Sequence, residues 1–532
     1  MFTSRVLGLL LCTGFCLISL HAQTTEGAIV GTVTDPSGAT IAGAVLTVAN
    51  MDTGISVKTT TDAAGNYVVT PLHIGRYMVT VEPAGFKKSV RSDITVNVQD
   101  RVRVDAALEV GAVTDTVEVA AAAPLLETDT SYLGEVVESQ RIVDLPLNGR
   151  FFTRLAVLTA GTAPTPAGAR DENTGGFSAN GVRPYQNNFL LDGVDNNSLS
   201  EDLVSQQSFV IGPPPDAIAE FKVQTNSMSA EFGRSGGAVL NVTIKSGTND
   251  LHGTVYDFLR NSDLDAKNYF DSPTNPIPPF KMNQFGFSVG GPVLLPKIYN
   301  GKNRTFFFFD YQGTRIRTGQ TFLASVPPDA WRTGDFSGYN QIFDPGTTVT
   351  NPDGSTTRMP FAGNQIPQSR WNPIAAKLLG MFPEPNVAGS VSPFGVSNNF
   401  LSNPSEPNDT NQFDLRIDHR ISDSDSIFGR FSFSNNTDNP PGPIPPPLDA
   451  ASFSSGNFIN KPRNLVISET HIFTPRTVNE LRLGYSRNHS ERLQFNANSN
   501  SSQQLGIPGV PFSKDNGGLP QFSVTGLNSF GS

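Results

Sequence analysis

The residue types that most often carry out chemistry are few in this chain and lie far apart. The six histidines show none of the short spacings with which histidine, cysteine and carboxylate side chains hold a metal ion; they are His21, His73, His252, His419, His471 and His489. The two cysteines, Cys12 and Cys16, both fall in an apolar segment at the N-terminus. We therefore expect no catalytic residues, no metal site and no cofactor.

Two short patterns are similar to ligand-binding loops but lack part of what such loops need. Asp192, Asp195 and Asn197 have the oxygen spacing of a calcium loop, but the downstream glutamate of an EF-hand is missing, so we favour a turn. The glycines within 233–237 do not follow a strand and open a helix, as a dinucleotide site requires. A secreted hydrolase would need a nucleophile with its base, or a metal set, and the sequence offers neither.

Length and composition indicate several domains built from short strands. The chain has 532 residues and a mass of 57.0 kDa, whereas one core rarely grows beyond about 250–300 residues. Glycine (49), proline (40) and phenylalanine (37) are abundant, which favours strands joined by turns. The net charge of −10 argues against general nucleic-acid binding, because that needs a basic surface.

The N-terminus has the pattern of a secretory signal peptide over 1–22. Arg5 provides the positive charge, 6–20 the apolar stretch, and Leu20-His21-Ala22 the small-residue end before Gln23. An N-terminal anchor helix is the alternative, although no stop-transfer pattern follows. No later apolar run reaches about 18 residues, so we expect any membrane insertion to use β-strands.

Residues 27–110 form a first module with strand-like runs separated by Pro, Gly and Asp turns, which predicts an antiparallel β-sandwich. The predicted strands are 28–34, 44–49, 57–61, 67–70, 75–82, 94–98 and 102–108. Gly31-Thr32-Val33-Thr34-Asp35, Gly43-Ala44, Thr61-Asp62-Ala63-Ala64-Gly65-Asn66-Tyr67 and Gly75-Arg76-Tyr77 resemble the carboxypeptidase regulatory-like domain. That resemblance implies a transthyretin-like sandwich of the carbohydrate-binding-like folds. It implies no peptidase, and carbohydrate binding follows only by analogy.

Residues 124–249 form a second module whose motifs resemble the plug of a TonB-dependent receptor of the Oar-like group. Its segments 144–150 (DLPLNGR) and 219–223 (AEFKV) belong to this series. The motif residues in the other segments are Asn180, Gly181, Arg183, Asp192, Gly193, Asp195, Arg234, Gly236 and Gly237. The resemblance implies a small α/β domain that fills a wide β-barrel.

The residues of this module fit that role. Asp192-Gly193 predicts a tight turn after the buried strand 189–191, and 236–249 predicts the last plug strand followed by a turn into the barrel. Arg150, Arg183 and Arg234 are candidates for ion pairs between plug and wall; the alternative is that each is a solvated loop arginine.

A connector over 111–123 joins the two modules. One interpretation is a last strand of the sandwich that runs into a linker. The plug resemblance implies another, in which a short extended segment pairs with TonB by strand addition, a backbone-driven mode that tolerates many sequences. The candidate TonB box is Thr114, Asp115, Thr116, Val117, Glu118 and Val119.

Residues 250–532 alternate apolar and polar side chains in segments of about ten residues, the pattern of a transmembrane β-barrel with a wet lumen. A soluble sandwich would also alternate, but its loops are usually short. The predicted strands are 251–260, 283–291, 304–314, 411–420, 426–435, 464–473 and 477–488. Two of the three connections at one end are very short and every connection at the other end is long, as barrels require.

These strands number about seven, whereas plugged transporters have about 22. The chain ends at 528–532 in a predicted outer loop, so we expect a C-terminally truncated sequence with only the first part of a barrel.

These observations predict an outer-membrane TonB-dependent receptor or transporter, with its N-terminal domain in the periplasm. The expected partners are a TonB-type energy-transducing protein, outer-membrane lipid and an unknown ligand, such as a siderophore, cobalamin, a glycan or a peptide. The alternative is a non-transport adhesin or envelope structural protein, because barrel shape does not fix function.

Overall fold

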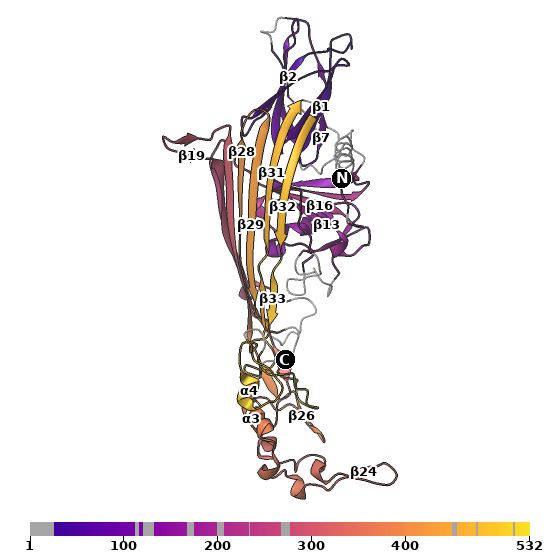
Figure 1. The fold of residues 1–532 in the computed structure, drawn as a ribbon, viewed down its shortest axis with the longest axis vertical. Coiled ribbons are helices and arrows are strands. Elements are labelled where there is room, and N and C mark those ends of the chain that lie inside the picture. The colour runs from indigo at the N-terminus through magenta and orange to yellow at the C-terminus, as the bar shows by residue number, and fades with distance from the viewer. Residues whose placement is uncertain are drawn as a thin grey trace, which may run out of the picture.

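The computed structural model is elongated, with a β-sandwich at one end, a large sheet in the middle and long loops at the other end (Figure 1). We call these ends the sandwich end and the loop end. The structure describes residues 26–111, 116–120, 132–166, 175–198, 207–233, 235–267, 277–448, 455–474, 477–513 and 517–531. The predicted signal peptide (1–22) and Arg234 lie outside them. In this described part, no helix is both long and apolar enough to cross a membrane.

The N-terminal sandwich has two sheets that enclose one apolar core. The first sheet has the order β4-β1-β7, with β8 also pairing with β1; the bounds are β1 Gly27–Thr34, β4 Asn66–Leu72, β7 Arg101–Arg103 and β8 Ala106–Ala107. The second has the order β3-β2-β5-β6-β9, with β2 Val45–Asn50, β3 Ser56–Thr60, β5 Gly75–Val81, β6 Lys88–Val96 and β9 Thr116–Ala120. Ile29, Leu46 and Val96 are fully buried between the sheets.

The sandwich is not antiparallel throughout, and the prediction is wrong in this respect. β1 runs parallel to β7 and β8, and β6 runs parallel to β9. In both cases the chain returns to a sheet after leaving it, and a strand that arrives by such a crossover is free to run parallel to its neighbour.

The middle domain contains a five-stranded sheet of order β10-β15-β16-β13-β14. The bounds are β10 Leu133–Glu138, β13 Asn188–Leu191, β14 Val194–Asp195, β15 Ile218–Asn226 and β16 Val239–Ile244. Around it lie the hairpin β11 Thr162–Pro164 with β12 Phe177–Ala179, helix α2 Ser139–Asp144, and the 3₁₀ helices Asn148–Arg150, Phe152–Leu158, Pro184–Gln186 and Pro215–Ala217. Phe177, Leu191 and Phe221 are fully buried in its core.

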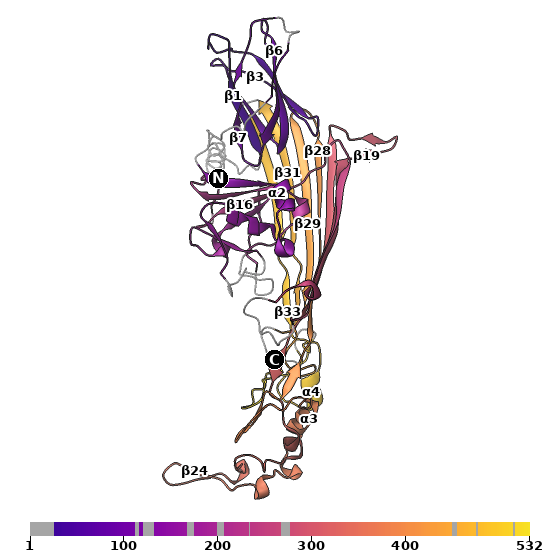
Figure 2. The ribbon, with the colours of Figure 1, turned by 180° about the vertical axis from the view of Figure 1, so that it is seen from behind.

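The large sheet follows in antiparallel order β17-β18-β21-β28-β29-β31-β32. Its strands are β17 His252–Asn261, β18 Phe280–Pro292, β21 Thr305–Gly319, β28 Ser405–Arg420, β29 Asp425–Asp438, β31 Arg463–Thr474 and β32 Thr477–Arg487. Figure 2 shows the middle domain against one face of this sheet. Among the described residues β17 and β32 pair with no further strand, so the sheet is open.

All seven predicted strands are present, but several are longer than predicted. β28 begins at Ser405 instead of residue 411, because its first residues pair with 314–319 of β21 although they show no apolar alternation. Two four-residue strands, β30 Asn457–Asn460 and β33 Ser490–Leu493, extend the sheet at the loop end. Segments this short cannot show a period of two, so the sequence did not predict them.

Two of the three connections at the sandwich end are short, the third being 293–304 with the strand pair β19 Leu294–Leu295 and β20 Tyr299–Asn300, and those at the loop end are long. β28 and β29 are joined by 421–424, and β31 and β32 by 475–476, whereas β21 and β28 are separated by 320–404. The last segment contains helix α3 Pro373–Met381 and the strand pair β22 Phe322–Ala324 with β27 Phe400–Ser402. Helix α4 Ser501–Leu505 lies near α3. A small core joins these loops, formed by Ala324, Val326, Leu378, Phe382, Ile444, Leu448, Leu519 and Phe530.

Candidate functional site at the inner face of the large sheet

The two faces of the large sheet differ in chemistry. On β29, Arg430 and Ser432 are buried beneath the middle domain, while Phe431 and Phe433 project to the other side. On β21, Phe308 is part of the core of the middle domain. The inner face is therefore covered and mostly polar, with apolar contacts such as Phe308, whereas the outer face is largely apolar, as the alternation in the sequence predicts.

Asp192 lies at the centre of the contact between the middle domain and this inner face. It is the first residue of the turn between β13 and β14, with φ of 49°, and Gly193 follows with φ of 73°. Two successive left-handed residues favour Asp, Asn or Gly, so the predicted tight turn is present here. The backbone N–H of Ile244 donates to Asp192 Oδ1 at 3.1 Å.

Two arginines from neighbouring strands of the large sheet hold this carboxylate. Arg416 Nη1 on β28 lies 3.1 Å from Asp192 Oδ1, and Arg430 Nε on β29 lies 2.9 Å from Asp192 Oδ2. The side chain of Asp192 is 2% exposed in this contact, and that of Arg430 is 0% exposed. We call Asp192, Arg416, Asp418 and Arg430 the Asp192 cluster.

Further bonds occupy the remaining donors of both guanidinium groups. Arg416 Nη2 lies 2.8 Å from Asp418 Oδ1, and its Nη1 also donates to the carbonyl of Ile244. Arg430 donates to Asn464 Oδ1 at 2.7 Å and to the carbonyl of Leu191 at 3.1 Å. Buried charges lose their hydration, and only such dense pairing offsets that cost.

The three arginines proposed for plug–wall ion pairs behave differently. Arg150 pairs with Asp216 inside the middle domain, and it reaches the sheet through ring contacts of 4.6 Å with Tyr256 and 4.3 Å with Phe258. Arg183 donates to the hydroxyl of Tyr185 in its own domain at 3.0 Å. Arg234 lies outside the described residues. In the Asp192 cluster the arrangement is reversed, because the middle domain supplies the carboxylate and the sheet supplies the arginines.

The other predicted motif residues shape turns. Asp195 Oδ1 accepts from the backbone N–H of Asn197 at 2.8 Å, which agrees with the turn interpretation rather than a calcium loop. Asn180 and Gly181, with φ of 53° and 78°, form the turn after β12, and Asn180 Nδ2 donates to the carbonyl of Thr225 at 2.8 Å.

The predicted glycine pair before β16 divides into two roles. A Cβ atom on Gly237 would lie 2.3 Å from Asn187 Oδ1, so close packing requires glycine there. A Cβ on Gly236 would meet nothing within 4 Å.

The predicted passage from this strand into the large sheet is present. After β16, Ser246 Oγ donates to Asp418 Oδ2 at 2.6 Å, and a Cβ on Gly247 would lie 2.4 Å from the carbonyl oxygen of Phe307. Chain and side chains thus both connect the middle domain to the sheet.

A second charged contact joins the middle domain to the sandwich. Lys222 Nζ on β15 lies 2.8 Å from Asp100 Oδ1, and the two side chains are 1% and 4% exposed. Glu220, two residues earlier on the same face, accepts the backbone N–H of Val98. Burial raises the pKa of Glu220 to about 8, an effect that the nearby Asp100 increases and Lys222 and the Val98 N–H reduce.

A cavity of about 490 Å³ lies where sandwich, middle domain and large sheet meet. Polar and charged side chains from all three parts line it, among them His73, Arg76, Lys245, Asp418 and Arg420. His73 lies between β4 and β5, and its Nδ1 is 3.3 Å from Glu26 Oε1.

The described part of the candidate TonB box belongs to the sandwich. β9 forms the edge of the second sheet, with Thr116 opposite Lys88 and Ala120 opposite Ser92 of β6. Thr114 and Asp115 lie outside the described residues. The sandwich-strand interpretation therefore applies to 116–120, and the opposite edge of β9 carries no strand among the described residues.

Sequence reasoning did not identify Arg416, Arg430, Lys222, Glu220 or Asp100 as contact residues between domains. The available signal was a charged residue in an otherwise alternating or apolar strand, since such a side chain needs a partner when a second domain covers it. The partner itself lies in another domain, and spacing cannot identify it.

A large antiparallel sheet with a mostly apolar outer face, whose mostly polar inner face is covered by a neighbouring domain, is the arrangement expected for part of an outer-membrane β-barrel. The chain belongs to the outer membrane β-barrel domain family, whose model matches residues 243–532. A second family model, the carboxypeptidase regulatory-like domain, matches residues 28–109. The chain is therefore an outer-membrane protein with an N-terminal regulatory-like sandwich.

The chain is also similar to individual known proteins. Over 333 residues the chain is 28% identical to the TonB-dependent transporter Oar of Myxococcus xanthus, a match that covers 59% of this chain and 30% of the relative. The siderophore receptor PirA of Acinetobacter baumannii has a TM-score of 0.39 at 14% identity, covering 73% of this chain and 43% of PirA. The outer membrane transporter YddB of Escherichia coli has a TM-score of 0.41 at 13% identity, covering 66% and 38%.

Proposed function

We propose that the protein is a TonB-dependent receptor that binds a ligand at its outer loops and middle domain and takes it up with energy from a TonB-type protein. The Asp192 cluster carries this proposal, because it holds the middle domain against the inner face of the barrel sheet as a plug must be held. The likeness to the TonB-dependent transporter Oar supports the same function. No bond in the ligand needs to be made or broken, which fits a non-enzyme.

In this proposal the sandwich end faces the periplasm and the loop end faces the outside. The short connections at 421–424 and 475–476 support this orientation, since barrels have short periplasmic turns and longer outer loops. The small core of the loop end, which includes Phe382 and Phe530, would hold the outer loops in a defined arrangement for ligand binding.

The TonB-type partner would bind at β9. Strand addition uses backbone hydrogen bonds, and β9 offers an edge with no partner strand among the described residues. A proline in β9 removes one backbone donor, whereas a β-branched polar residue keeps the backbone intact. Comparing these two kinds of substitution therefore distinguishes binding through the backbone of β9 from binding through its side chains.

Binding of the chain in detergent to the purified C-terminal domain of its TonB-type partner tests the proposal. We expect Val117→Pro to weaken binding by at least about tenfold through the lost strand pairing. The matched Val117→Thr should bind as the parent does. Absence of binding by the parent, or equal binding by both variants, would contradict a box at 114–119.

The alternative of a surface adhesin or envelope structural protein, with carbohydrate binding through the sandwich, predicts no such complex. Uptake assays in cells with and without the TonB-type protein separate the two functions. Ferric siderophores, cobalamin, glycans and peptides are the ligands to compare.

A further inference from the structure

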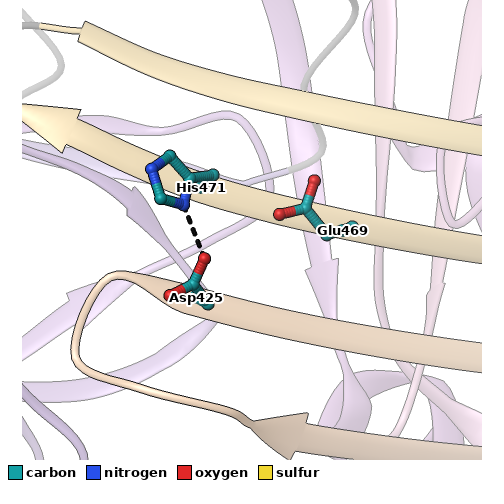
Figure 3. Close-up of side chains that lie close together, drawn as sticks. All are labelled: Asp425, Glu469 and His471. Atoms are coloured by element: carbon teal, nitrogen blue, oxygen red, sulfur yellow. Dashed lines mark hydrogen bonds and ion pairs between the residues drawn. The ribbon is translucent and has the colours of Figure 1, made fainter.

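The outer face of the large sheet carries three metal-ligating side chains near its sandwich end (Figure 3). Asp425 is the first residue of β29, and His471 lies directly opposite it on β31. Glu469 precedes His471 by two residues, so both side chains project from the same face of β31. One ligand atom from each of the three lies within 4.8 Å of the others.

This group is separate from the Asp192 cluster, because it lies on the opposite face of the sheet. Along β31 the inward residues Val466 and Ser468 are 0% and 2% exposed, whereas Ile467 on the outward face is 42% exposed. Glu469 and His471 continue the outward series. The group therefore lies on the outer face near its sandwich end, where the cross-strand neighbours of Glu469 are Ile427 and Leu481.

The ligand types indicate which ion fits. One imidazole nitrogen with two carboxylates suits Zn²⁺ and related first-row metals, whereas Ca²⁺ and Mg²⁺ favour oxygen alone. Three protein ligands leave one position of a tetrahedral site for water.

The group offers two carboxylates to a cation, one of them already paired within the protein. His471 Nδ1 lies 2.5 Å from Asp425 Oδ1. Glu469 forms no side-chain hydrogen bond or ion pair among the described residues, although it is half-buried and next to a second carboxylate. Two neighbouring carboxylates repel each other, and a divalent cation between them removes that repulsion.

Surrounding contacts orient two of the three ligands. Ser422 Oγ donates to Asp425 Oδ2, which leaves Asp425 Oδ1 toward His471. The His471 ring packs edge-on against Phe473 with their centroids 4.2 Å apart. Contacts of this kind fix ligand orientation in metal sites. Because β29 and β31 are hydrogen-bonded neighbours, only side-chain rotation is needed to close the site.

We propose that Asp425, Glu469 and His471 bind one Zn²⁺ ion, which joins β29 to β31 at the sandwich end of the outer face. Its ligands are Asp425 Oδ1, one carboxylate oxygen of Glu469, His471 Nδ1 and a water molecule. The site does not depend on the proposed receptor function, because it lies outside both the plug contact and β9.

Calorimetric titration of the chain in detergent with Zn²⁺ tests this proposal, after removal of any histidine tag and of bound metal by a chelator. We expect one Zn²⁺ per chain. Glu469→Gln and His471→Gln should each weaken the affinity by at least about tenfold, since even loss of an outer contact has that effect in metal sites. Circular dichroism confirms the strand content of each variant.

His489 provides the matched control, because its Nε2 lies 2.6 Å from Glu491 Oε1 but no third ligand completes a group there among the described residues. His489→Gln should bind Zn²⁺ as the parent does. The proposal is overturned if the parent binds no Zn²⁺, if Glu469→Gln binds as tightly as the parent, or if His489→Gln causes the same loss. Should His471→Gln lose strand content, Glu469→Gln decides, because Glu469 makes no bond that folding needs.

Discussion

The middle domain is held by buried charges on two sides, and the two contacts are built differently. Toward the large sheet, the Asp192 carboxylate receives bonds from Arg416 and Arg430 on neighbouring strands and from one backbone N–H. Toward the sandwich, Lys222 pairs with Asp100, and Glu220 accepts a single backbone N–H. The first contact joins one carboxylate to two arginines, whereas the second joins one lysine to a carboxylate and a backbone carbonyl, with the Glu220 carboxyl group beside it.

This difference has a consequence for pH. Guanidinium groups keep their charge at any pH that a folded protein tolerates, so the charges of Arg416 and Arg430 do not change with pH. Glu220 has a pKa of about 8 and changes charge near neutral pH. The arginine charges in the contact with the large sheet are therefore fixed, whereas the charge of Glu220 in the contact with the sandwich changes with pH.

The largest expected effect comes from Asp192→Asn, which keeps the left-handed turn but removes the charge. Two buried arginines would then face a neutral amide. We expect the contact between the middle domain and the large sheet to lose about 3–5 kcal/mol of stability. Hydrogen exchange of 188–195 measures it. Asp195→Asn in the same hairpin is the control and should change little; equal effects of the two variants would mean that the turn, not the charge, matters.

Lys222→Met should have the next largest effect. We expect the contact between sandwich and middle domain to lose about 3 kcal/mol of stability, because Asp100 remains buried without its lysine. The change should separate the sandwich from the middle domain while both keep their cores. Exchange of the backbone amides at 97–100 reports this undocking. If the free energy of unfolding of the sandwich or of the middle domain falls by the same amount, the docking contact and the stability of that domain are not independent.

Raising the pH should weaken the contact between the middle domain and the sandwich, by a smaller amount per pH unit than either substitution. Between the ordinary glutamate pKa of 4.5 and the docked value of about 8, docked Glu220 keeps a proton that the undocked form releases. Docking is therefore strongest below pH 4.5 and weakens about tenfold per pH unit up to pH 8. Exchange of the Val98 amide from pH 6 to 9 measures this slope, and Glu220→Gln should abolish it.

The smallest effect should come from Lys87→Met, which breaks the exposed pair of Lys87 Nζ and Glu109 Oε2 at 3.0 Å. That distance is close to the 2.8 Å between Lys222 and Asp100, but Lys87 and Glu109 are both solvated. We therefore expect the free energy of unfolding in urea to fall by less than about 1 kcal/mol. A loss as large as that of Lys222→Met would show that burial does not set the difference.

Much of the fold could be predicted because local signals and tertiary structure agree. Phe413, Leu415 and Ile417 alternate with charged residues on β28, and the strand lies with one face covered, as the pattern indicates. Prediction failed where the signal was absent, as at Ser405 at the start of β28, or where chain crossovers decide direction, as for β7 and β9.

The candidate site was less accessible to sequence reasoning. Asp192 was assigned a turn, which is present, but its partners Arg416 and Arg430 lie on other elements more than two hundred residues further along the chain. Asp425 is likewise remote from Glu469 and His471 until β29 and β31 pair. Strand register, not spacing, brings these groups together.

The hairpin at Asp192 also limits which amino acids natural variation can place there. A φ of 49° favours Gly, Asn and Asp, and the two arginines demand a negative charge. Glutamate supplies the negative charge but does not favour this φ. Asparagine favours this φ but carries no charge. In a library of all twenty amino acids at position 192, we expect selection for a retained plug to return aspartate alone.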